Sequence, residues 1–378
     1  MDPGRIAIGT WSGGRFMRFG DELDESRLQE LLTPGGGIDT VISADTYGQG
    51  GADRLLGRAL AGTARESYSL VGAVGHDFYE GERDGPKGFP RFTDPRLRGP
   101  QAYGPYLRMA TERILERLGV DRLDLLLLHN PDRVGYASEQ VWEAMAGLRD
   151  AGLTEAIGVA PGPANGFTLD LLDCFERFGE LLDWAMVILN PFEPWPGELV
   201  LDAAGTHRIK LITRVVDYGG LFWGDVRPGH LFAEHDHRKF RPEGWVEAGA
   251  GKLDALDPIL ERTGLTPIQL ACAWNLAQAP VECVAPTLIQ EIGAGARPIE
   301  DKRAELAALP AEERLSQADL AEIRRIGDNS GCMALKGASP EHEGEERPDR
   351  WALTEELAAA GRRWGVEPER DLVKLAER

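Results

Sequence analysis

Two side chains that can exchange protons come at the ends of apolar segments typical of buried strands. Tyr47 lies in "VISADTYG", and His129 ends "LDLLLLH". Because an imidazole ordinarily has a pKa of about 6.5, we expect His129 to act as a general base near neutral pH and Tyr47 as the acid or hydrogen-bond donor. Asp45 is a candidate to orient either group, although capping the turn explains its position equally well.

A third candidate is Arg214, in the apolar segment "IKLITRVV". A guanidinium inside a protein needs an anionic partner, which here is Asp217, another acid, or a carboxylate or phosphate of the substrate. We therefore expect Arg214 to anchor an anionic group of a substrate. His235 and His237 are two residues apart, but no clear third ligand accompanies them, so no metal site is predicted.

The elements that must position these side chains alternate along the chain. Short apolar segments typical of strands recur, each followed by a helical pattern such as "LRMATERILERLG". Eight such alternations predict a single (β/α)8 barrel. A doubly wound sheet is the runner-up, but no GxGxxG turn follows the first strand. The segments that we assign to strands are "RIAIGTW", "DTVISA", "YSLVGAV", "LDLLLLH", "TEAIGVA", "WAMVILN", "IKLITRVV" and "VECVAP".

Two long segments interrupt the repeat. Residues 76–105 and 217–247 are expected to be long loops at the carboxyl ends of the third and seventh strands, the face where barrel enzymes place their chemistry. Tyr218 lies in the second loop and is a candidate substrate-binding residue. We expect residues 1–328 to form the barrel and residues 329–378 to form a C-terminal loop and helix packed on it.

Composition narrows the classes of partner. The 378-residue chain carries a net charge of −20, which disfavours nucleic acid and anionic membranes as partners. No apolar run is long enough to span a bilayer, and the four cysteines are widely separated. We therefore expect a cytoplasmic protein that acts on a small molecule, and the sequence leaves a homo-oligomer open.

Several motifs resemble the aldo/keto reductases. "GTW" follows the first strand, "ADTYGQGGADRLLGRAL" follows the second, and "ERLGVDRLDLLLLHNPD" contains the fourth. "YGGLFWGDVRPG" and "LTPIQLACAWNLAQ" are similar to later motifs of that family. The resemblance implies a (β/α)8 barrel and NADPH-dependent carbonyl reduction. It places Tyr47 and His129 at two of the four catalytic positions, and Trp11 and Asn130 in the substrate pocket.

The chain departs from the family pattern at the positions that serve this chemistry. The catalytic Asp and Lys are replaced, and with them the cation that the resemblance assigns to lowering the pKa of Tyr47. The nicotinamide contacts are also lost, and an arginine stands where an aromatic ring stacks on the nicotinamide. The replaced positions are occupied by Ile42, Ala73, Ala160, Pro161, Met186 and Arg214.

These losses favour an enzyme that binds no cofactor. The main hypothesis is a non-redox dehydratase, lyase or isomerase of a small, sugar-like carbonyl or polyhydroxy compound. Its base is His129, its acid is Tyr47 and its anchor is Arg214. The first alternative is an NADPH-dependent aldo/keto reductase with an atypical set of catalytic residues. The second is a catalytically silent binding protein that has kept the barrel.

Overall fold

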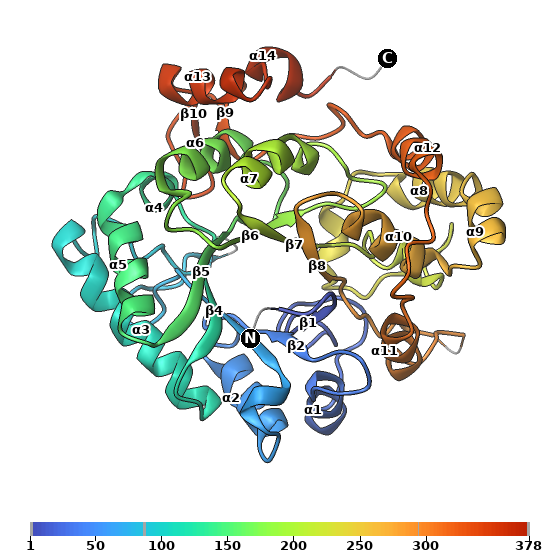
Figure 1. Ribbon diagram of the computed structural model, residues 1–378, viewed down its shortest axis with the longest axis horizontal. Coiled ribbons are helices and arrows are strands. Elements are labelled where there is room, and N and C mark those ends of the chain that lie inside the picture. Colours follow the sequence, from blue (N-terminus) through green and yellow to red (C-terminus); the bar gives the residue numbers. More distant parts are fainter. Residues whose placement is uncertain (1–2, 86–87, 294, 376–378) are drawn as a thin grey trace.

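The computed structural model describes residues 3–85, 88–293 and 295–375. Eight parallel strands form one sheet in chain order, and a parallel bridge between Ile6 and Val284 joins the last strand to the first. The sheet thereby closes into a barrel with helices around it (Figure 1). The predicted single (β/α)8 barrel is confirmed. Its strands are β1 (Ala7–Gly9), β2 (Thr40–Ile42), β3 (Ser69–Val74), β4 (Leu123–His129), β5 (Thr154–Ala160), β6 (Trp184–Ile188), β7 (Lys210–Arg214) and β8 (Val281–Ala285).

The helices follow the strands along the chain. They are α1 (Glu25–Leu32), α2 (Gly51–Leu60), α3 (Tyr103–Leu118), α4 (Arg133–Ala137), α5 (Glu139–Asp150), α6 (Thr168–Phe178), α7 (Leu201–Thr206), α8 (Trp245–Asp254), α9 (Asp257–Thr263), α10 (Pro267–Leu276), α11 (Ile299–Ala307) and α12 (Gln317–Gly327). Short 3-10 turns are η1 (Arg65–Ser67), η3 (Pro100–Ala102), η4 (Gly197–Val200), η5 (Leu221–Trp223) and η6 (His237–Phe240). Among the described residues, no helix is both long and apolar enough to cross a membrane.

Local sequence signals explain where two of the helices begin or end. Thr266 and Gln269 form a reciprocal capping box at the start of α10, with Pro267 at its first position. Gly119 ends α3 in the left-handed conformation, with φ of 71°. These signals fix where α10 begins and where α3 ends.

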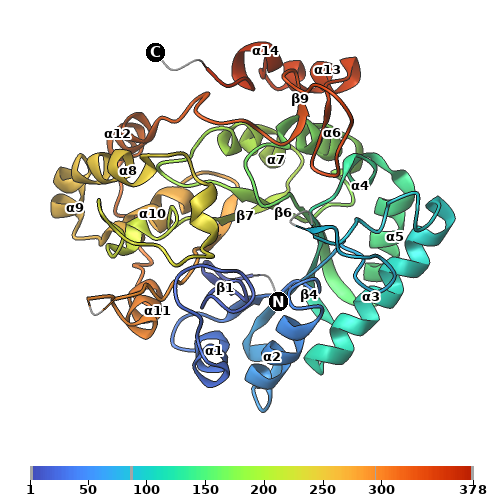
Figure 2. The same cartoon turned by 180° about the vertical axis from the view of Figure 1, so that it is seen from behind.

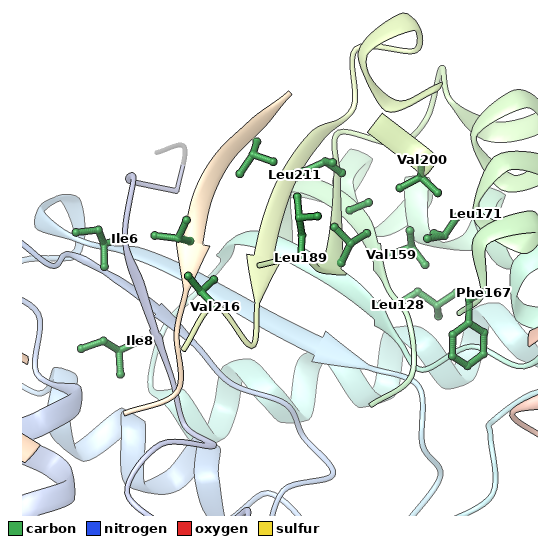
Figure 3. Packing of buried hydrophobic residues seen from close by; sticks show 14 of the residues in the cluster. Ile6, Ile8, Leu128, Val159, Phe167, Leu171, Leu189, Val200, Leu211 and Val216 are labelled. Atoms are coloured by element: carbon green, nitrogen blue, oxygen red, sulfur yellow. The ribbon is translucent and has the colours of Figure 1, made fainter. Parts of the chain in front are cut away.

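Two apolar layers hold the barrel together. The outer layer joins strands to helices, and Figure 3 shows part of it, including Leu128 of β4, Val159 of β5 and Leu171 of α6. The inner layer fills the barrel with side chains that alternate with the outer ones along each strand. Among its members are Ile42, Ala73, Leu127, Ala160 and Met186.

The C-terminal segment packs against the outside of α6. It contains two short parallel strands, β9 (Gly337–Ser339) and β10 (Arg350–Ala352), and the helices α13 (Glu355–Arg363) and α14 (Pro368–Asp371). Asp170 of α6 accepts hydrogen bonds of 2.9 Å from the amide of Ala338 and the indole of Trp351. Figure 2 shows the segment along the α6 side of the barrel. The segment contains more helices and strands than the expected loop and single helix. The domain boundary at residue 328 stays a prediction.

Candidate functional site

A cavity of about 530 Å³ opens at the carboxyl ends of the strands, and we call it the mouth cavity. Both long loops contribute to its wall, the first through His76 and Phe89 and the second through His237. A larger and more open cavity, of about 820 Å³, lies between residues 132–140 and the C-terminal segment, and none of the predicted site residues lines it. The chemistry predicted from the sequence therefore belongs to the mouth cavity. Of the predicted residues, it is lined by Trp11, Tyr47, His129, Asn130 and Arg214.

Tyr47 and His129 meet edge to face in this cavity. Their ring centroids are 5.8 Å apart with an interplanar angle of 88°. The Nδ1 atom of His129 is buried and has no hydrogen-bond partner among the described residues. The structure thus brings together two side chains that are 82 positions apart in the sequence, since β2 and β4 each end at the same face of the barrel.

The environment of His129 holds its imidazole neutral. Burial, with the nearby positive charges of Arg91 and Arg214, lowers the pKa of His129 to about 3. A group with such a pKa is a poor proton acceptor at neutral pH. This low pKa disfavours the general-base role expected of His129 near pH 7, and the sequence shows neither the burial nor the two arginines that cause it.

Arg214 provides a positive charge close to Tyr47. Burial raises the pKa of Tyr47, and the Arg214 guanidinium opposes that shift. The sequence-based inference that no cation remains to lower the pKa of Tyr47 is therefore corrected. The cation comes from β7, on the far side of the barrel from the position that Ala73 now occupies on β3.

Arg214 is held by backbone carbonyls. Its Nη2 atom donates to the carbonyl oxygens of Pro161, at 3.2 Å, and of Gly162. It forms no ion pair with any residue that the structure describes, and its Nε and Nη1 atoms make no hydrogen bond there. The anchor role for Arg214 requires a guanidinium without a carboxylate partner, and that role stays a prediction.

Asp217 is not the partner of Arg214. Its carboxylate accepts hydrogen bonds from the backbone amides of Gly220, at 2.9 Å, and Thr287, at 2.8 Å. The first bond closes a turn within the second long loop, and the second ties the start of that loop to the segment after β8. Asp217 therefore has a structural role.

Tyr218 does not line the mouth cavity. The guanidinium of Arg241 lies over its ring at 4.4 Å, and its ring edge contacts those of Phe192 and Trp245. The loop turns this ring toward α8, so the geometry of the cavity gives no support to the substrate-binding role expected of Tyr218.

Asp45 is also outside the cavity, although Ala44 and Thr46 line it. Its side chain is fully buried, and burial together with the nearby Asp53 carboxylate raises its pKa well above the ordinary value. Asp45 therefore does not reach a ligand in the cavity, and its expected part in orienting Tyr47 or His129 has no contact to support it.

Trp11 and Asn130 both line the cavity, and local geometry explains their positions. A Cβ atom on Gly9 would lie 2.3 Å from the Trp11 ring, so the ring needs a glycine beneath it. Asn130 adopts a left-handed backbone with φ of 50°, which asparagine tolerates better than most residues. The side-chain nitrogen of Asn130, Nδ2, lies 3.0 Å from Nε2 of His76. Their roles in substrate binding stay predictions.

The replaced family positions form an apolar floor. Each of Ile42, Ala73, Ala160, Pro161 and Met186 lines the cavity, and none brings an ionisable group. Because both the acid and the lysine of the family are absent, neither leaves an unpaired charge on this floor. A single buried charge without a partner would be costly.

Two further candidates lie beside His129: His76, a reserve acid/base candidate because it follows the third strand, and Arg91, which the sequence did not suggest. His76 follows β3 and its ring lies 5.4 Å from that of His129. Arg91 is almost fully buried, donates to the Asn130 carbonyl oxygen and lies 3.1 Å from Nδ1 of His76. Arg91 lies in the middle of the first long loop, where the sequence gives no signal of its contacts.

Comparison with known proteins identifies the family. The model of the aldo/keto reductase family matches residues 5–327. The chain belongs to the aldo/keto reductase family.

Three of the similar proteins share between 21% and 24% of their residues with this chain. A 6-dehydroglucose reductase from Agrobacterium fabrum is 24% identical over 293 residues, which are 73% of this chain and 81% of that protein. The structure of a glycerol dehydrogenase from Gluconobacter oxydans has a TM-score of 0.65 and 21% identity, covering 85% of this chain and 90% of its own. An aldo/keto reductase from Klebsiella pneumoniae, in complex with NADP and acetate, has a TM-score of 0.56 and 21% identity, covering 86% and 91%.

These comparisons overturn two expectations. The non-redox lyase or isomerase reading is wrong, because the similar proteins are named as reductases and dehydrogenases. The expectation of no cofactor is also contradicted, since a similar structure contains NADP. The sequence shows the replacement at position 214 as a loss, whereas in the structure Arg214 brings a positive charge close to Tyr47.

Proposed function

We propose that this protein is a nicotinamide-dependent oxidoreductase that interconverts a small carbonyl compound and its alcohol. The names of the similar proteins support this reaction class. The observation that carries the proposal is the neutral state of His129 beside Tyr47. An imidazole that stays neutral can donate a hydrogen bond to a carbonyl oxygen, and its lowered pKa makes it too weak a base to remove a proton from carbon readily.

The cavity fits a reduced nicotinamide ring in part. The apolar floor of Ile42, Ala73, Ala160 and Met186 offers a surface against which an uncharged ring can pack. These floor residues carry no side-chain amide for a carboxamide, and Asn130 is the amide side chain among the described residues that line the cavity. Binding is therefore expected to be weaker than in a family member with amides on the floor. When bound, the dinucleotide supplies or accepts the hydride.

Tyr47 and His129 bind and protonate the carbonyl oxygen in this proposal. Since Nδ1 of His129 is buried without a partner, the favoured tautomer has its proton on Nε2, because a buried acceptor is tolerated better than a buried donor. Nε2 then donates to the carbonyl oxygen and orients it. Tyr47 gives its hydroxyl proton to the same oxygen as negative charge develops there.

Arg214 has a supporting electrostatic role. Its charge favours the tyrosinate form that Tyr47 adopts after proton transfer. From its place on β7, Arg214 thus acts to lower the pKa of Tyr47, which is the effect that the resemblance assigns to a lysine at position 73.

The test combines binding and turnover. Titration with NADPH and with NADH, followed by protein fluorescence, is expected to give saturable binding of at least one of them. Oxidation of that cofactor should accompany reduction of an aldehyde, and Tyr47→Phe should abolish the oxidation without abolishing the binding. Tyr68→Phe is the matched control, because Tyr68 precedes β3 at the opposite end of the barrel. Absence of binding and turnover with both cofactors would overturn the proposal.

A further inference from the structure

The wall of the mouth cavity has the opposite charge to the chain as a whole. The sequence contains 62 acidic and 42 basic residues. Of the described residues that line the cavity, none is Asp or Glu, and four are arginines. Charges of one sign in a concave site raise the local concentration of the opposite ion. The arginines are Arg15, Arg18, Arg83 and Arg214.

Arg18 is exposed and has no counter-ion among the residues that the structure describes. Its backbone is fixed, because its carbonyl oxygen accepts a 2.8 Å hydrogen bond from the amide of His237. Arg15 is already engaged by Glu22 and Glu25, at 3.4 and 3.7 Å.

Arg214 is held by backbone carbonyls beside Tyr47, and Arg83 donates to the carbonyl oxygen of Gly85 in its own loop. Arg18 is therefore the guanidinium next to the rings of segment 15–19 that has no ion-pair partner among the described residues.

The same wall is rich in rings. The segment 15–19 reads "RFMRF", and all five of its residues line the cavity. Phe19 lies edge to face with His237, with centroids 5.6 Å apart, and Trp11 and Phe89 line the cavity as well. Aromatic walls of this kind bind flat apolar groups, whereas a polyhydroxy compound needs many hydrogen-bonding partners.

We propose that the substrate is an amphiphilic anion, with a carbonyl at Tyr47 and His129, an apolar body against the rings of segment 15–19, and a carboxylate at Arg18. This inference rests on the proposed function, because it names the substrate of the same site. It assigns Arg18 to substrate selection, and it leaves Arg214 as the cation beside Tyr47.

The test compares matched substrates. 4-Carboxybenzaldehyde is expected to exceed benzaldehyde in kcat/KM by about tenfold or more, since a hydrogen bond to a charged group commonly contributes that much. It should also exceed D-glucuronate, which carries a carboxylate on a hydroxylated body. Arg18→Met should abolish the preference for 4-carboxybenzaldehyde over benzaldehyde. Arg325→Met is the charge-matched control, because Arg325 is exposed on α12 and absent from the cavity.

Each result decides between outcomes. Equal turnover of the two benzaldehydes, better turnover of D-glucuronate, or a tenfold weaker cofactor Kd in Arg18→Met would overturn the inference while leaving the oxidoreductase proposal intact. If no aldehyde is reduced, the proposed function fails, and calorimetry on 4-(hydroxymethyl)benzoate against benzyl alcohol still decides the inference. Tighter binding of the carboxylate, lost in Arg18→Met, would support it. Equal binding would refute it.

Discussion

The neutral state of His129 has a measurable consequence for stability. The unfolded chain binds a proton at this residue with a pKa of about 6.5, whereas in the folded protein the pKa is about 3. Below pH 6.5 the unfolded state therefore binds more protons than the folded state. The stability that a neutral, buried His129 allows is complete above pH 6.5 and is lost as the pH falls toward 3.

The size of the effect follows from the interval between the two pKa values. Each pH unit below 6.5 costs about 1.4 kcal/mol, so lowering the pH from 7 to 5 should cost about 2 kcal/mol through His129 alone. In His129→Asn this contribution is absent. Urea unfolding of wild type and His129→Asn at pH 5, 7 and 8 measures the difference, and the interval from pH 7 to 8 is the internal control, because His129 is neutral there in both states. An equal loss of stability in the two proteins between pH 7 and 5 would refute a buried, neutral His129.

Three further predictions test other parts of the site. Arg214→Met should slow carbonyl reduction and raise by about 1–2 units the pKa of the basic limb in the pH profile of alcohol oxidation, because a positive charge near Tyr47 is lost; an unmoved limb would show that Arg214 does not act on Tyr47. Ile42→Asp and Ala73→Lys should each cost about 3–5 kcal/mol of unfolding free energy as buried unpaired charges, and the double variant should cost clearly less than the sum; additive costs would mean that the two positions do not pair. Asp217→Ala should cost about 2–4 kcal/mol, because the amides of Gly220 and Thr287 lose their acceptor; a cost near zero would contradict the anchoring of this loop.

The fold could be predicted because its signals are local. Each strand is a short apolar segment, each helix carries its own periodicity and caps, and the chain order of strands is also their spatial order. The long loops could be placed at the mouth because they follow strands. The convergence of Tyr47, His129 and Arg214 on one cavity followed from the same topology.

The chemistry of the site depends on contacts that the sequence does not display. The pKa of His129 depends on burial and on Arg91, which reaches it from the middle of a loop. The direction of the Tyr218 ring depends on packing against Arg241 and Trp245. Comparing Ala73 with the family position revealed a missing lysine, but only the folded chain shows that Arg214 approaches Tyr47 from another strand.

The most direct test of the central claim follows the hydride itself. NADPH and NADH carrying deuterium at C4 of the nicotinamide, in separate 4R and 4S forms, are incubated with the protein and either benzaldehyde or 4-carboxybenzaldehyde. The account predicts that mass spectrometry finds one deuterium in the alcohol from one of the two forms, and none with Tyr47→Phe. An alcohol without label from all of the deuterated cofactors would contradict it.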